Sequence, residues 1–264
     1  MTRFDTYVTV NGERLFVDPS DQRASAILQR DGDMHPAASA LWRHALGMTR
    51  WDHVLDIGAN YGDMLVGAPL PDDATITAIE PNPRVLPYLV ETLRLARPQA
   101  RVLPYAVSDT TGKAMLHENL TWSGNSTLAE DWVADKADHV WRLVRVPAIT
   151  LTALLGEIGV AGSQTLLMKI DIEGHERRVL QPALEPLSSM ARCAVMVEIV
   201  RMNDDDLRWL LTNFAVSALD TAEGTLVDVN GASSSAFREM IDRGGLYPRD
   251  VIAVPRADRS GQRG

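Results

Sequence analysis

Cysteine is almost absent from this 264-residue chain, and long hydrophobic runs are absent altogether. The single cysteine, Cys193, lies in the apolar run RCAVMVEIV, so we expect a buried thiol and exclude an intrachain disulfide. No stretch reaches the roughly 18 consecutive apolar residues that a membrane span requires. Residues 1–15 carry charges and a turn where a secretory signal would need an apolar segment, which predicts a cytoplasmic protein with no membrane partner.

A surplus of positive charge is also lacking. The 26 lysines and arginines are outnumbered by 35 acidic residues, which gives a formal net charge of -9, and no basic run contains interleaved aromatic residues. Both features disfavour nonspecific binding to nucleic acid or to anionic membranes. We therefore expect no nucleic-acid partner, while a homo-oligomer is compatible with the composition.

What the chain does contain is a regular alternation of strand-like and helix-like segments. Apolar runs such as TLLMKID are typical of strands covered on both faces of a parallel sheet. The expected strands span residues 52–58, 74–80, 100–109, 112–118, 165–171 and 193–199, with a closing hairpin over 215–229 and 250–255. The expected helices span residues 35–48, 83–96 (with Pro83 in the first turn), 150–159 (between Thr150 and Gly159) and 204–214. This pattern predicts an α/β fold with an open, doubly wound, mostly parallel sheet.

The two ends of the chain depart from this alternation. Residues 6–18 alternate around Asn11-Gly12, a strong hairpin signal, so we expect residues 1–34 to form a β-ribbon and a linker. Residues 35–255 are expected to form one domain, because no repeat or composition break divides them. Residues 256–264 are polar and are expected to be a disordered tail.

Two strand ends point to a nucleoside ligand, because such sheets bind ligands outside the carboxyl ends of their strands. Gly58 and Gly62 in VLDIGANYGDM allow a tight turn. Glu80 ends the second strand, at the sequence separation from Gly58 at which a carboxylate can accept the hydroxyls of a ribose. Asp56 would repel a pyrophosphate, and the third glycine of a dinucleotide loop is missing. S-adenosylmethionine fits better, since its ammonium can pair with Asp56 or a neighbouring carbonyl; an ordinary strand–helix turn and a solvated acid remain the alternative.

The segment KIDIEGHE places several ionisable groups directly after a buried run. We expect Lys169 to pair locally and Glu176 to be an acid in the first turn of a helix. Asp171 and Glu173 need a compensating partner, because burying an ionised carboxylate costs several kcal/mol. His175 has two readings, a base or a structural histidine.

Together, the segments VLDIGANYGDM, AIEPNP, PYAVSDTTG, SGNSTL and MKIDIEGHERRVL resemble the FkbM family of class I methyltransferases over residues 35–230. The resemblance implies a seven-stranded Rossmann-like sheet with an antiparallel last strand and S-adenosylmethionine as cofactor. It also implies O-methylation of a small-molecule acceptor, at a hydroxyl group of a natural product or sugar or, less often, at a carboxyl group.

The resemblance also assigns roles to residues. The implied cofactor residues are Asp56, Gly58, Asn60, Gly62 and Glu80, with Ser108 or Asp109 near the adenine. The expected acceptor residues are Trp122, Asn125 and Ser126, for which a polar surface loop is the alternative, and Glu198 at the end of the fifth strand. One departure concerns YGDMLVGAPLPDDA, which is shorter and richer in proline than the helix expected there and leaves the methionine side of the cofactor undefined.

Two mechanisms are compatible with these residues. In the first, Asp171 positions the acceptor, and His175 or Glu173 takes the proton of its hydroxyl. In the second, Asp171, Glu173 and Glu198 bind a divalent cation such as magnesium. We favour the metal-free mechanism, because the spacing of these acids matches no self-sufficient metal motif.

Two rival functions follow from the same residues. An NAD(P)-dependent oxidoreductase could use the glycine loop, but Asp56, the missing glycine and the lack of a Tyr-x-x-x-Lys pair disfavour it. A non-catalytic binding subunit with a methyltransferase fold is disfavoured, because Asp56, Gly58, Glu80 and Asp171 are all intact.

Overall fold

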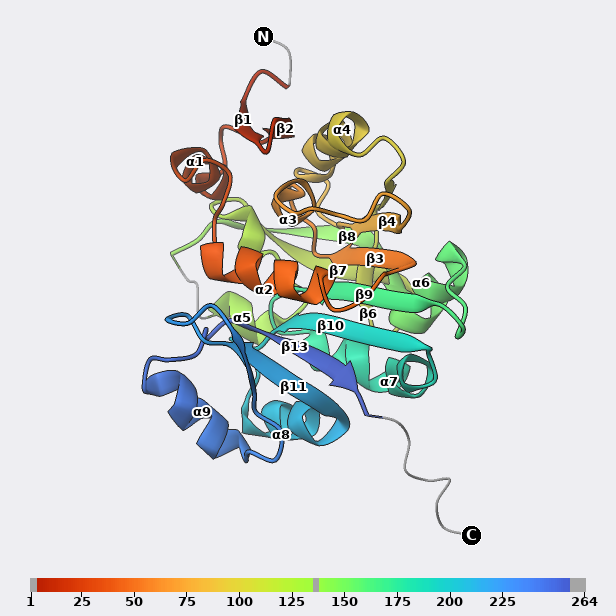
Figure 1. The fold of residues 1–264 in the computed structure, drawn as a ribbon. Coiled ribbons are helices and arrows are strands. Elements are labelled where there is room, and N and C mark those ends of the chain that lie inside the picture. Colours follow the sequence, from red (N-terminus) through yellow and green to blue (C-terminus); the bar gives the residue numbers. More distant parts are fainter. Residues whose placement is uncertain (1–3, 135–137, 257–264) are drawn as a thin grey trace.

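A central eight-stranded sheet forms the middle layer of the computed structural model, which describes residues 4–134 and 138–256 (Figure 1). Its strand order is β12-β11-β13-β10-β9-β3-β4-β5. The strands are β3 (His53–Ile57), β4 (Thr75–Ile79), β5 (Arg101–Leu103), β9 (Thr165–Ile170), β10 (Arg192–Glu198), β11 (Phe214–Leu219), β12 (Leu226–Asp228) and β13 (Asp250–Pro255). Most of the predicted tail, residues 257–264, lies outside the described residues.

The pairing of these strands confirms the predicted fold class. Strands β5, β4, β3, β9 and β10 run parallel, whereas β13 lies antiparallel between β10 and β11. The chain order reverses between β3 and β9, which places the expected ligand crevice at their carboxyl ends. The short strand β12 adds an eighth member, because the hairpin after β11 folds back along the edge of the sheet.

Helices cover both faces of the sheet. One face packs against α6 (Leu151–Ile158), α7 (Glu176–Ser188), α8 (Asp204–Asn213) and α9 (Ser234–Asp242), and the other against α2 (Pro36–Leu46), α3 (Asp63–Val66) and α4 (Leu86–Ala96). Cys193 is a free, buried thiol in the first of these cores, as expected. Within residues 4–134 and 138–256, no helix has both the length and the apolar character needed to cross a membrane.

Several local predictions were correct and several were wrong. Thr150 caps α6 by accepting a hydrogen bond from the Ala153 amide, and Gly159 ends that helix in the left-handed conformation, as predicted. The predicted helix over 83–96 begins only at Leu86, because the Asn82 side chain accepts a bond from the Arg84 amide and folds those residues into a turn. Pro83 therefore lies outside the helix.

The predicted strand over residues 100–109 is divided at Pro104. Its first part is β5, and its second part, β6 (Ala106–Ser108), joins a separate sheet of order β6-β8-β7. That sheet contains β7 (Gly112–Asn119), longer than predicted, and β8 (Trp141–Thr150), which the sequence analysis did not predict. The intervening segment contains η1 (Ser123–Asn125) and α5 (Glu130–Ala134).

The N-terminal residues form the predicted ribbon, in which β1 (Tyr7–Val10) pairs antiparallel with β2 (Glu13–Phe16). Helix α1 (Gln22–Gln29), absent from the prediction, follows where a linker was expected, and Asp21 caps it. The ribbon packs on α4, where the Phe16 amide donates to the Thr92 hydroxyl. The domain boundaries at residues 34 and 255 stay a prediction.

Candidate functional site

A cavity of about 640 Å³ lies at the carboxyl ends of the parallel strands. The predicted site residues that line it are Asp56, Gly58, Asn60, Glu80, Trp122, Asn125, Ser126, Asp171, Glu173 and His175. The predicted residues that are not part of this lining in the described structure are Gly62, Ser108, Asp109 and Glu198. The residues predicted from the ends of β3, β4 and β9 and from the 122–126 segment therefore line one cavity.

The loop after β3 passes directly over the end of β9. Gly58 has a φ of 83°, and its amide and that of Ala59 both donate to the Ile79 carbonyl. A Cβ atom on Gly58 would overlap the backbone carbonyl oxygen of Asp171. The position requires glycine for its conformation and for this close approach. Gly62 also has a positive φ but packs against Leu89, so its role in the structure is to seat the loop on α4.

Glu80 is held in a fixed orientation by the backbone. Its two carboxylate oxygens accept hydrogen bonds from the amides of Asn60 and Asn82, each at 2.8 Å. Burial raises the pKa of Glu80 to about 7, although the two amides oppose this rise. A carboxylate oxygen has two acceptor sites, so each oxygen can still accept a hydroxyl. This arrangement fits the two hydroxyls of a ribose.

Asp56, near the end of β3, is a buried acid with an unused acceptor. Its Oδ1 atom has no hydrogen-bond partner in the described ranges, and the Lys169 ammonium lies 3.8 Å away. Burial raises the pKa of Asp56 to about 6, against the attraction of Lys169. Buried polar atoms are rarely left unsatisfied, so an acceptor on a cavity wall points to a donor on a ligand. The ammonium group of S-adenosylmethionine fits this requirement.

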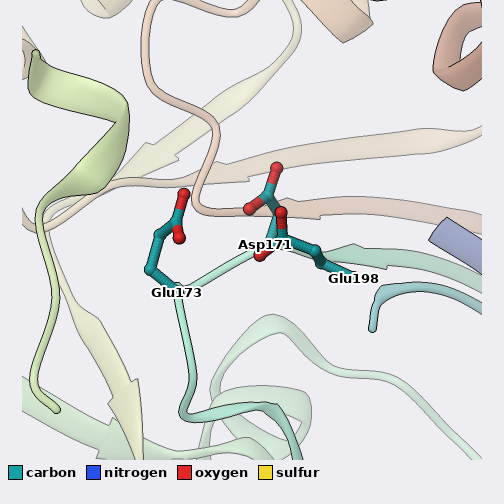
Figure 2. A group of neighbouring side chains, drawn as sticks. All are labelled: Asp171, Glu173 and Glu198. Carbon is teal, nitrogen blue, oxygen red and sulfur yellow. The ribbon is translucent and has the colours of Figure 1, made fainter. Parts of the chain in front are cut away.

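Three carboxylates gather beside this loop, from the turn after β9 and the end of β10 (Figure 2). Oxygen atoms of Asp171, Glu173 and Glu198 all lie within 4.8 Å of one another. Each acid faces its own cation: the pairs are Lys169–Asp171 at 3.0 Å, Arg201–Glu173 at 3.6 Å and Arg249–Glu198 at 2.7 Å. The local pairing expected for Lys169 is thus confirmed, and each of the three acids has one cationic neighbour.

The three acids differ in their pKa values, and burial together with the charges of Asp171 and Glu173 raises the pKa of Glu198 well above its usual range. Burial raises the pKa of Asp171, but its ion pair with Lys169 outweighs burial and holds the pKa below the usual range. Burial and the charge of Asp171 raise the pKa of Glu173 to about 8. Glu173 also has a φ of 53°, and Thr127 donates to its carbonyl at 2.8 Å. A carboxylate on the cavity wall that has a raised pKa and a strained backbone is suited to accept a proton once it is ionised.

His175 has a different neighbour. Its Nε2 atom lies 3.2 Å from the Ser108 hydroxyl on β6, and burial lowers its pKa. The carboxylate of Glu176 turns back to accept bonds from the amides of Ile172 and Gly174, which stabilises the turn before α7. The structure therefore links His175 with the side of the cavity expected for adenine, while Asp171 and Glu173 belong to the acid cluster.

The 122–126 segment is hydrogen-bonded to the loop after β3, called the cofactor loop (residues 58–62), and to the turn after β4. The side-chain amide of Asn60 donates through Nδ2 to the Ser123 hydroxyl, and that of Asn82 donates through Nδ2 to the Ser126 hydroxyl, both at 3.1 Å. Ser126 also donates to the Ser123 carbonyl at 2.8 Å. The hydroxyl of Ser126 is therefore already engaged within the protein, whereas the contact of Trp122 and Asn125 with an acceptor stays a prediction.

The sequence analysis missed several charged residues of the site. Arg201 follows β10, and its guanidinium lies 3.1 Å from the centre of the Trp132 ring. Arg249 and Asp250 stand at the start of β13, and the pairing of Glu198 with Asp250 brings them to the carboxyl edge. The sequence could have predicted Arg249 and Asp250, because an antiparallel last strand begins at the edge where the parallel strands end.

The family profile described as "Methyltransferase FkbM domain" matches residues 56–224, which include the cofactor loop, Glu80 and the acid cluster. The chain belongs to the FkbM methyltransferase family. It is accordingly an S-adenosylmethionine-dependent methyltransferase, and the buried Asp56 oxygen, the fixed Glu80 carboxylate and the close approach at Gly58 fit that cofactor.

Solved structures with similar folds are distant from this FkbM protein. A SAM-dependent O-methyltransferase from Thermotoga maritima has 10% identity and a TM-score of 0.43, with 97% of this chain and 80% of that chain covered. A magnesium protoporphyrin IX methyltransferase from Synechocystis has 11% identity and a TM-score of 0.39, with 89% and 84% covered. Curated proteins gave no match. Likenesses this weak say nothing about the acceptor.

Replacing Glu80 by glutamine should raise the Kd for S-adenosylmethionine about 10- to 100-fold, because a charge-assisted hydrogen bond is worth roughly 1.5–3 kcal/mol. The pKa of about 7 gives a second expectation: wild-type affinity should rise with pH through about 7 as Glu80 ionises, and the variant should lose this dependence. Titration calorimetry measures both. Glu118→Gln is the control, because Glu118 is buried outside the cavity lining; equal effects of the two substitutions would contradict the ribose assignment.

Proposed function

We propose that this FkbM methyltransferase transfers the methyl group of S-adenosylmethionine to a hydroxyl oxygen of a small molecule such as a natural product or sugar. The position and the raised pKa of Glu173 are the observations that support this proposal most strongly. A hydroxyl must lose its proton to become a good nucleophile, and Glu173 presents a cavity-lining carboxylate with a pKa raised to about 8. A carboxylate acceptor is already ionised near neutral pH and would need no such base.

The residues of the acid cluster have distinct tasks in this proposal. S-adenosylmethionine, when bound, supplies a methyl group on a positively charged sulfur. Asp171, kept ionised by Lys169, lies under the cofactor loop and orients the acceptor hydroxyl. Glu173 takes the proton as the oxygen–carbon bond forms, and the electron pair of the broken carbon–sulfur bond stays on sulfur.

The alternative role of the acid cluster is to bind a divalent cation. Oxygen ligands suit magnesium, and the three carboxylates are close enough to share an ion. Against this, each of the three acids already has a cationic partner, Lys169, Arg201 or Arg249, with which a dication would have to compete. We therefore propose the metal-free mechanism.

Turnover should survive exhaustive chelation. The measurement compares methyl transfer by protein dialysed against a chelator with transfer after magnesium is added back. Equal rates are expected, because Lys169, Arg201 and Arg249 each pair with an acid of the cluster without an ion. A complete loss that magnesium reverses would contradict the metal-free mechanism and make Asp171, Glu173 and Glu198 ligands.

The chemical class of the acceptor can be tested with S-adenosylmethionine carrying a radiolabelled methyl group. Panels of sugars, other polyols, phenols and carboxylic acids are incubated with the protein, and labelled products are treated with mild base. A methyl ether survives this treatment and a methyl ester does not. Base-stable label supports the proposal, and label that is released by base would assign a carboxyl acceptor. Binding of NAD in a parallel titration would favour the oxidoreductase alternative.

A further inference from the structure

Arg23 of helix α1 reaches the cavity although it lies outside the matched family segment, residues 56–224. Its Nη2 atom pairs with Asp63, immediately after the cofactor loop, at 3.2 Å. Its Nη1 atom is buried and has no hydrogen-bond partner among the described residues. Arg23 lines the cavity, and its unpartnered guanidinium nitrogen is a donor that an anionic or carbonyl group of a ligand can satisfy.

The position of Arg23 is fixed by neighbours that belong to the cofactor site. Asp21, at the start of α1, accepts hydrogen bonds from the Tyr61 hydroxyl at 2.7 Å and from the Ser123 amide at 3.1 Å. A Cβ on Gly124 would lie 2.9 Å from the Arg23 side chain. Helix α1 is therefore held between the cofactor loop and the 122–126 segment, with Arg23 directed into the space between them.

The amino acid end of S-adenosylmethionine carries one ammonium and one carboxylate, and residues of the cavity lining carry buried polar atoms that could pair with each. The Oδ1 atom of Asp56 lacks a donor and the Nη1 atom of Arg23 lacks an acceptor within the described residues. Arg201 also has a buried nitrogen without a hydrogen-bond partner among the described residues, its Nε atom, but that atom faces Glu173 of the acid cluster at 3.6 Å. Lys169 and Arg249 pair with Asp171 and Glu198, and Arg43 is exposed. Arg23 also pairs with a carboxylate, Asp63, but only through Nη2, which leaves Nη1 free beside the loop after β3.

We propose that Arg23 binds the carboxylate of the cofactor's methionine moiety, so that the N-terminal segment completes the cofactor site. The sequence left the methionine side of the cofactor undefined, because the helix after the first loop is short, and α3 indeed spans only Asp63–Val66. In this proposal α1, which lies outside the matched family segment, supplies the contact to the methionine carboxylate. The inference rests on S-adenosylmethionine as cofactor and is independent of the acceptor.

Decarboxylated S-adenosylmethionine tests this contact directly, because it lacks only the carboxylate. Calorimetry with wild-type protein should show tighter binding of S-adenosylmethionine than of the decarboxylated compound by about 10- to 100-fold. Arg23→Gln should weaken binding of S-adenosylmethionine by a similar factor and change binding of the decarboxylated compound less than about threefold. Arg23→Lys should give an intermediate loss, because it keeps the charge without the planar fork.

Arg84→Gln is the matched control. Arg84 also ties the N-terminal segment to the domain, through an ion pair with Asp18 at 2.7 Å, and its side chain is 14% exposed, as is that of Arg23, but it is not among the lining residues described. It should affect both compounds equally. Equal weakening of both compounds by Arg23→Gln, or equal wild-type affinity for the two, would overturn the proposal. Wild-type protein that binds neither compound would overturn the cofactor assignment itself.

Discussion

Replacement of Gly58 by alanine is expected to abolish cofactor binding and to lower the free energy of unfolding by several kcal/mol. The left-handed conformation at φ 83° alone costs a non-glycine residue on the order of 1–2 kcal/mol. The added methyl group would also overlap the carbonyl oxygen of Asp171. That oxygen belongs to the backbone at the end of β9, so no side-chain rotation relieves the overlap, and the loop or the strand end must move.

Gly159→Ala separates the two contributions. Gly159 has a nearly equal φ of 80°, but no atom lies within 4 Å of the position its Cβ would occupy. This control should lose only about 1–2 kcal/mol and bind S-adenosylmethionine like wild type. Denaturant unfolding and cofactor titration give the two readouts. Similar behaviour of the two variants would show that the loop does not approach β9 as closely as the structure describes.

Glu173→Gln is expected to lower kcat about 10²- to 10⁴-fold, because it removes the positioned base while keeping the shape of the side chain. Cofactor affinity should change little, since Glu80 and Asp56 are the residues expected to bind the ribose and ammonium ends. The wild-type rate should rise with pH to about 8, because the carboxylate must be ionised to accept a proton and burial raises its pKa to that value. The variant should lose this rise.

Comparison of His175→Ala with Glu173→Gln tests which of the two residues is the base. Its ring lies 3.2 Å from the Ser108 hydroxyl on β6, so we expect this variant to affect cofactor affinity more than kcat. Asp171→Asn should reduce kcat as well, because Lys169 then loses its ionised partner. The assay measures kcat and cofactor Kd for the three variants once an acceptor is found. A full-rate Glu173→Gln enzyme combined with a slow His175→Ala enzyme would transfer the role of base to His175.

Much of the cavity lining at the ends of β3, β4 and β9 was predictable from short segments. The loop around Gly58, the acid at Glu80 and the turn after Lys169 are each defined within about ten residues by strand periodicity and by glycines that allow positive φ. The fold class followed from the same alternation, because parallel strands with crossover helices have few possible arrangements. Errors at this level were local, as at Pro83, where a side-chain bond from Asn82 decided the start of α4.

Contacts between distant segments were decided by the tertiary structure. Glu173 acquires its raised pKa because burial and Asp171 act on it together, and its partner Arg201 arrives from the segment after β10. Arg249 lies at the site because β13 pairs antiparallel with β10, and Arg23 lies there because the hydrogen bond from Tyr61 to Asp21 holds α1 in place. Local periodicity reports which face of an element is buried, but not which charged group of another element will face it. The elements of this fold were therefore predictable from the chain, whereas the pairing of charges in the site required the packed structure.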